Sequence, residues 1–197
     1  MPERHGKEAT ADLISIMAGW SMVTPEQQGR FRRQIAAGAQ QVGLTDADII
    51  SALGRGMPTI KAMGWTPEQA VETIAVLAAR ETGRKKMSLP ATTLQGLIAP
   101  QPSGIEESLV AEAEAKGKVT AKAEAQIKAR AEELAQDPQQ LLAYLTQKQQ
   151  KMDQKAFTRL LVNIYGTEAA AGVSKLLIEP RRDIRQTLRE ACRSSWG

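Results

Sequence analysis

Apolar residues recur along this chain at the three- and four-residue spacing of amphipathic helices. The clearest case lies in residues 66–79, where one side of the predicted helix carries Ala70, Val71, Ile74, Leu77 and Ala78. Similar patterns predict further helices over residues 9–22, 25–41, 45–57, 89–98, 139–150, 153–165 and 167–177, and a last helix from Pro180. No segment shows a convincing strand pattern. The sequence therefore predicts an all-α fold, a compact multi-helix domain of short helical hairpins.

Two similar junctions carry the strongest helix-end signals, and their residues are Gly43, Leu44 and Thr45, then Gly64 and Thr66. Each glycine can close one helix in the left-handed conformation, and each threonine can open the next with a capping box. Pro58 lies between the junctions and is expected to break the helix there. These signals predict a helical hairpin over residues 43–83, around which we expect the rest of the fold to be organised.

The composition shifts to Ala, Glu and Lys in residues 105–136. These residue types favour helix, so we expect one long helix with a single interruption at Gly117. Its apolar stripe is thin, which leaves two interpretations: an assembly helix in a coiled coil or channel, or a solvated connector. We expect three segments: helical hairpins in residues 1–100, this spacer in 101–136, and a helical block in 137–197, in which Gly166 ends a helix.

Composition and charge indicate what kind of core the chain can form and where its basic residues lie. Hydrophobic residues make up 42% of the 197 residues but aromatic residues only 4%, so the core must consist mainly of small and aliphatic side chains. The net charge is +4, and the excess lies in residues 137–197, which hold 10 Lys and Arg against 6 Asp and Glu. The last helix is the basic one, with Arg181, Arg182, Arg185 and Arg189 at overlapping turns. These arginines could contact phosphates or a partner, or could offset helix-end carbonyls and nearby acids.

A second basic group, Arg30, Arg32 and Arg33, is either a contact patch or a solvated helix face. The glycine and lysine spacing in residues 83–86 matches no nucleotide motif, so we expect an exposed turn there. The chain has one cysteine, Cys192, and one histidine, His5, which disfavours disulfide and metal sites. We therefore predict no enzyme activity and no catalytic, metal or cofactor-binding residues. Neither a signal peptide nor a membrane span is expected.

The two junctions resemble a region in the core domain of phage tail tape-measure proteins. The matching positions are Gly43, Leu44, Thr45, Ile49, Ala52, Leu53, Pro58, Lys61, Gly64, Thr66, Glu68 and Gln69. Residues 89–94 partly match a later family element. A further element is similar to Ile164, Tyr165, Gly166, Thr167, Glu168, Ala169, Gly172, Leu176 and Leu177. The resemblance spans roughly residues 35–180, in the order that the family has.

This resemblance implies a structural virion protein of a bacteriophage that acts in tail assembly and genome ejection by oligomerising in or at the tail channel. It implies homo-oligomers, with tail-tube, tail-tip or portal proteins as partners. The implied location is the virion, in the tail or channel interior, after assembly in the host cytoplasm. Contact with DNA would be non-specific, and contact with a membrane would be transient at most.

The chain departs from the family in length. A single helix of 197 residues would span only roughly 300 Å at about 1.5 Å per residue, and the Gly and Pro breaks prevent an extended rod. We therefore expect the core domain without the long tape. Two alternatives stay open at this point: an internal ejection or channel protein of a phage, and a small basic helical adaptor that binds nucleic acid.

Overall fold

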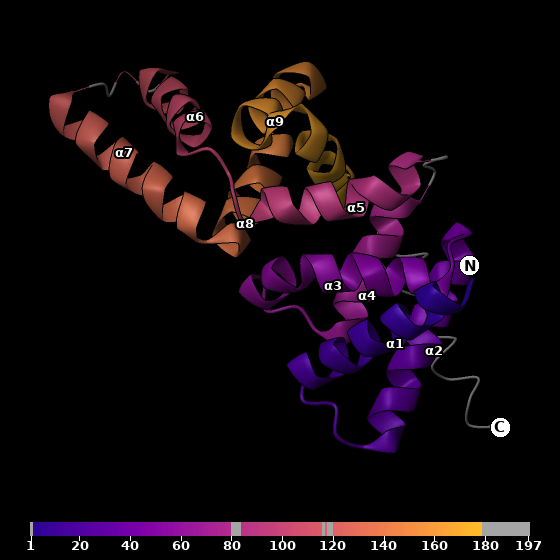
Figure 1. The fold of residues 1–197 in the computed structure, drawn as a ribbon. Coiled ribbons are helices and arrows are strands. Elements are labelled where there is room, and N and C mark those ends of the chain that lie inside the picture. The colour runs from indigo at the N-terminus through magenta and orange to yellow at the C-terminus, as the bar shows by residue number, and fades with distance from the viewer. Residues whose placement is uncertain (1, 80–83, 116, 118–119, 179–197) are drawn as a thin grey trace. The chain divides into compact units, whose positions relative to one another are not determined.

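The computed structural model describes residues 2–79, 84–115, 117 and 120–178, and these are helical with short connections (Figure 1). The all-α class is confirmed, and no strand occurs within those ranges. The helices are α1 (Pro2–Gly19), α2 (Pro25–Val42), α3 (Asp46–Ala62), α4 (Pro67–Ala78), α5 (Arg84–Leu97), α6 (Pro102–Ala115), α7 (Ala121–Gln136), α8 (Pro138–Gln149) and α9 (Gln154–Ile178).

The chain divides into two compact units, and the division falls inside α5. The first unit takes in the described residues up to Ala91, and the second runs from Thr92 to Leu177. This division differs from the three segments expected from composition. The described Ala, Glu and Lys-rich residues lie in the second unit together with α8 and α9 up to Leu177.

Helix α4 is the central helix of the first unit. Every residue from Ala70 to Ala78 is buried, including Glu72 and Thr73, whereas the sequence pattern predicted burial of one side only. The reason is that α2 and α3 both pack against α4, while α1 packs on α3. A helix with neighbours on several sides buries more than one apolar stripe. The first unit is therefore organised around α4.

The expected break at Pro58 is wrong, because α3 continues through this residue to Ala62. A proline inside a helix crowds the carbonyl group four residues earlier, here that of Gly54. Gly54 is exposed, and nothing lies within 4 Å of where its Cβ would be, so the backbone has room to adjust. The residues after Pro58, Thr59 and Ile60, are buried, and their packing favours continuation of the helix.

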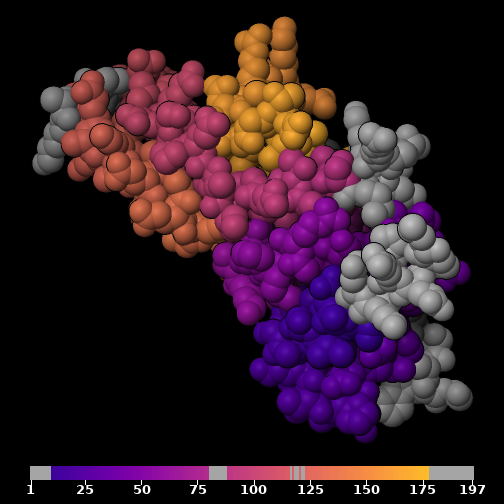
Figure 2. Space-filling model, in the orientation of Figure 1, coloured from indigo at the N-terminus to yellow at the C-terminus, as the bar shows by residue number. Residues whose placement is uncertain are grey.

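The expected long helix over residues 105–136 is instead a helical hairpin. Helices α6 and α7 pack against each other, and Figure 2 shows their side chains forming one continuous surface. Gly117 lies between them with φ +66, a left-handed conformation that glycine adopts readily. Ala131 and Leu134 are buried in this arrangement. The thin apolar stripe is therefore sufficient to pack α7 into the fold, because α7 lies against a neighbouring helix of the same chain.

Two further expectations concern helix ends. Residues 84–86 belong to α5, so the expected basic turn is wrong for these three positions. Gly166 does interrupt the helical geometry, since it has φ 74 and ψ 168 within α9. This glycine divides α9 into two helical segments, as the sequence predicted.

Candidate functional site

The two predicted junctions form as expected in the first unit. Gly43 and Gly64 have φ 62 and 61, in the left-handed region. The N–H of Thr45 donates to Asp48 Oδ2 (2.9 Å), and the N–H of Asp48 donates back to Thr45 Oγ1 (3.3 Å). The corresponding contacts at Thr66 with Gln69 are 2.9 and 3.3 Å long. Each junction satisfies backbone groups that a helix end leaves unpaired, and together they fix the directions in which α3 and α4 begin.

A tryptophan pair, which the sequence did not indicate, holds the second junction to α1. The indole N–H of Trp20 donates to the carbonyl oxygen of Trp65 at 3.2 Å. The Trp20 ring also packs edge-on against Phe31, with the ring centroids 5.5 Å apart. An indole N–H that is removed from water generally needs a hydrogen-bond acceptor. This general need is the one clue that the sequence holds, and it does not say which carbonyl group Trp20 contacts. These contacts connect the end of α1 to the residue just before the Thr66 cap.

The two later blocks of the tape-measure resemblance meet within the second unit. A Cβ added at Gly172 would overlap the Thr93 side chain, and one added at Gly96 would lie 2.5 Å from the Cβ of Ala169. Thr93 is itself fully buried. Helices α5 and α9 therefore approach so closely that glycine is required at these two positions. Residues about seventy positions apart in sequence form one packed contact.

A third glycine brings the start of α6 against α9. A Cβ at Gly104 would collide with the carbonyl group of Asn163. The N–H of Gln101 donates to the carbonyl oxygen of Ile164 at 2.7 Å, just before the break at Gly166. A carbonyl near a helix break lacks its usual partner, and Gln101 supplies one. The break at Gly166 thus leaves a carbonyl group on α9 to which the α5–α6 connection is hydrogen-bonded.

The second unit also carries a groove of about 440 Å³ between α6, the end of α8 and the start of α9. Its surface is mainly apolar, with small side chains along much of its length. The lining residues are Gly104, Glu107, Ser108, Ala111, Glu112, Ala115, Lys148, Met152, Ala156, Arg159, Leu160 and Asn163. Four of these side chains are ionisable, and they are Glu107, Glu112, Lys148 and Arg159.

A polar network crosses one end of this groove. The hydroxyl of Tyr144 donates to Glu112 Oε1 (2.9 Å) and lies 2.8 Å from Ser108 Oγ. Lys148 forms an ion pair with Glu112 and lies over the Tyr144 ring, 5.4 Å from its centroid. Also among the lining residues, the amide of Asn163 on α9 donates to Glu107 Oε2 (2.9 Å). Both carboxylates in the groove therefore already have partners.

Burial raises the pKa of the Tyr144 hydroxyl well above its ordinary value of 10.0, and the negative charge of Glu112 adds to the rise. Burial alone raises the pKa of Tyr165 in the same direction. The Tyr165 hydroxyl has no hydrogen-bond partner among the described residues. Both phenols are therefore neutral at physiological pH and contribute packing, with Tyr144 also donating a hydrogen bond.

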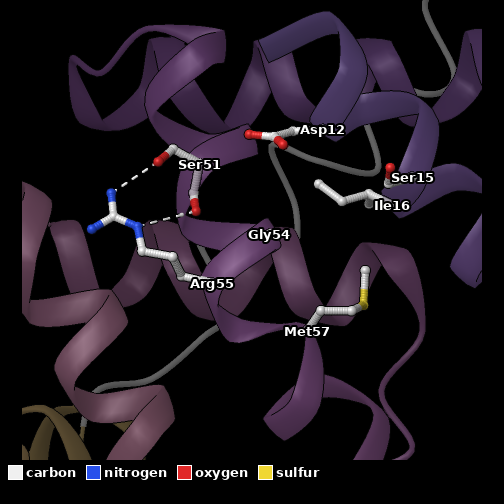
Figure 3. Close-up of a pocket in the computed structure, with 7 residues that line it drawn as sticks. All are labelled: Asp12, Ser15, Ile16, Ser51, Gly54, Arg55 and Met57. Atoms are coloured by element: carbon white, nitrogen blue, oxygen red, sulfur yellow. Dashed lines mark hydrogen bonds between the residues drawn. The ribbon is translucent and has the colours of Figure 1, made fainter. Parts of the chain in front are cut away.

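A smaller notch of about 330 Å³ lies between α1 and α3 in the first unit (Figure 3). The Arg55 guanidinium is turned toward Ser51 of its own helix, donating from Nη2 to Oγ (2.8 Å) and from Nε to the carbonyl oxygen (3.4 Å). Asp12 lines the same notch from α1. Asp12 and Arg55 are both exposed.

The structure describes only some of the predicted basic contact residues. Arg181, Arg182, Arg185 and Arg189 lie outside the described residues. Arg30, Arg32 and Arg33 lie on α2 and are all exposed.

Among the described residues, no three His, Cys, Asp or Glu side chains are grouped so that they could hold a metal ion. Within the same ranges, none of the helices is long and apolar enough to cross a membrane.

Comparisons of this chain with protein-family models, with curated proteins and with solved structures find no match.

The α5–α9 contact predicts a specific effect of Gly172→Ala. The new methyl group must displace the buried Thr93 side chain, and such overpacking costs about 1–3 kcal/mol of unfolding free energy. Gly54→Ala is the matched control, because Gly54 is an exposed helical glycine with open space around it. That control should be stabilising by about 0.5–1 kcal/mol. Urea unfolding followed by circular dichroism measures both, and equal effects would contradict the close contact.

The raised phenol pKa values predict the alkaline behaviour of the protein. Because both tyrosines ionise more readily in the unfolded chain, their stabilising effect is present below pH 10.0 and is lost as the pH rises above it. Phenolate absorbance should therefore appear together with loss of helical circular dichroism. Phenolate formation centred near the ordinary pKa, with helicity unchanged, would show that the tyrosines are not buried.

Proposed function

We propose that this chain is a structural, non-enzymatic protein of a bacteriophage particle that resembles the core domain of tail tape-measure proteins. It acts in tail assembly and genome ejection by oligomerising in or at the tail channel. One observation supports the proposal above others. Thr93, in the first of the two later blocks of the resemblance, packs against Gly172 in the second, and the nearby Gly96 packs against Ala169.

The physical roles of the motif residues also support this proposal. Gly43 and Gly64 allow left-handed backbone, while Thr45 and Thr66 cap helices. Gly172 permits close helix contact. Each of these residues shapes the backbone, so the motif describes a packing unit. A packing unit that presents grooves on its surface is suited to assembly with other subunits.

The compact units favour a core domain that lacks a long tape. Each is built from short helices joined by tight connections, as in α3 and α4. The proposed partners are other copies of the chain and tail-tube, tail-tip or portal proteins, within the virion and, during assembly, in the host cytoplasm. An internal ejection or channel protein with the same packing is a closely related variant of this proposal.

Sedimentation velocity of the purified full chain across a wide concentration range tests the proposal. We expect species heavier than the 21.4 kDa monomer to grow with concentration, because assembly by self-contact obeys mass action. Self-association driven by apolar contact should persist at raised salt concentration. A protein that remains monomeric at the highest concentration reached would contradict the proposal.

A second candidate, non-specific nucleic-acid binding, is favoured by the arginines of α2. Arg30, Arg32 and Arg33 are exposed, and none of them makes an ion pair or hydrogen bond with another residue that the structure describes. Three unpaired guanidinium groups can contact backbone phosphates without reading sequence.

The matching test is a mobility-shift titration with DNA of arbitrary sequence at low and moderate salt. If α2 binds phosphates, affinity should fall steeply with salt, and replacing the three arginines by glutamine should flatten that dependence. Binding that is absent at low salt, or unchanged in the triple variant, would remove α2 as a nucleic-acid contact.

A further inference from the structure

Val23 is an exception to the burial pattern of this protein. It is 80% exposed, more than Ile14 (58%) or Ile98 (41%), the other large apolar side chains that are exposed among the described residues. Val23 lies in the connection between α1 and α2, directly before the Thr24 cap. A single exposed apolar residue is common on protein surfaces, so its meaning depends on how it is held.

The sequence around the two TPEQ caps explains why Val23 is exposed. An apolar residue before a cap usually packs on the fourth helical residue, the contact called a hydrophobic staple. Before Thr66 the corresponding residue is Trp65, which is half-buried, and the fourth helical residue is the buried Ala70. Before Thr24 the pair is Val23 and Gln28. Because Gln28 cannot form an apolar staple, Val23 has no packing partner within its own helix.

The connection nevertheless holds Val23 in a defined position. Its N–H donates to Gln27 Oε1 (3.1 Å), and the Gln28 side chain donates to the carbonyl oxygen of Met22 (3.1 Å). Ser21 has φ 53, a left-handed conformation that is unfavourable for a residue with a side chain. Both hydrogen bonds hold the peptide group between Met22 and Val23, and on the other side of Val23 the N–H of Thr24 also donates to Gln27 Oε1 (3.1 Å). Together they fix an apolar side chain that faces solvent. We call residues 21–26 the Val23 tip.

The groove of the second unit has properties that match this tip. Ala111, Ala115 and Ala156 leave room for an aliphatic side chain, and Met152 can adapt its shape to one. The carboxylates of Glu107 and Glu112 in the groove already have hydrogen-bond or ion-pair partners. Arg159, which also lines the groove, is exposed and has neither an ion pair nor a hydrogen bond with any residue in the described ranges.

The tip carries the complementary charge. Glu26 lies three residues after Val23, in the first turn of α2, and is also exposed, with no ion pair or hydrogen bond to the part of the chain that the structure describes. We propose that the Val23 tip of one copy inserts into the groove of a second copy, where Glu26 pairs with Arg159. This inference rests on the proposed self-association and names the surfaces that produce it. Because tip and groove are different surfaces, the contact is heterologous, and repeating it builds a ring or an open filament.

Three single variants of the full chain test the contact by sedimentation velocity. Val23→Asp removes the apolar anchor and Arg159→Glu reverses the charge in the groove, so each should remain monomeric at concentrations where the wild-type chain assembles. Ile14→Asp is the matched control, since it places the same charge at another exposed apolar position, and it should assemble like wild type. All three changes lie at exposed residues, and circular dichroism verifies that the variants are folded.

A mixture of two defective variants gives the sharpest result. Val23→Asp retains an intact groove and Arg159→Glu retains an intact tip, so an equal mixture should form pairs of twice the 21.4 kDa monomer mass and grow no further. The chain that carries both Glu26→Arg and Arg159→Glu should regain assembly, because the ion pair is restored with reversed sign.

The outcomes separate this inference from the proposed function. If the wild-type chain assembles and Val23→Asp assembles equally well, the tip-and-groove contact is wrong while self-association stands. A mixture that stays monomeric also overturns the contact. If the wild-type chain never assembles, both this inference and the proposed function fail.

Discussion

The structure depends on the close approach of helix backbones through small side chains. With only 4% aromatic residues, the chain cannot fill wide spaces between helices with large rings. Core stabilisation then has to come from many short contacts, because apolar burial and dispersion both fall when a gap is left between surfaces. The contacts of Gly96 with Ala169 and of Gly172 with Thr93 show this directly. In the first unit, Ala75 and Ala78 of α4 pack in the same way with Val42.

Local signals allowed the sequence to predict the helix ends well. A capping box is specified by two residues three positions apart, and a left-handed cap by one glycine, so Thr45, Thr66, Gly43 and Gly64 could be assigned without knowledge of the fold. The break at Gly166 is a signal of the same kind. The burial of α4 on all sides was missed, because it depends on how many helices surround it.

Where tertiary packing overrides a local preference, the sequence-based expectation was incorrect. Pro58 is unfavourable inside a helix, yet the burial of Thr59 and Ile60 favours continuation. Gly117 was recognised as an interruption, but its consequence, a hairpin of α6 and α7, requires the two Ala-rich stripes to face each other. The Tyr144 and Glu112 contact joins residues 32 positions apart, so no local pattern could reveal it. The predicted contact residues Arg181 to Arg189 lie outside the described residues.

We propose above that the chain is a packing unit that assembles with copies of itself in a phage particle. Mass spectrometry of purified particles from a phage that encodes this chain tests that claim most directly. Peptides from both units should be present in the particles at several copies each, in a fixed ratio to the major tail protein. Their absence from particles, with the same peptides abundant in the infected-cell lysate, would contradict a structural role in the virion.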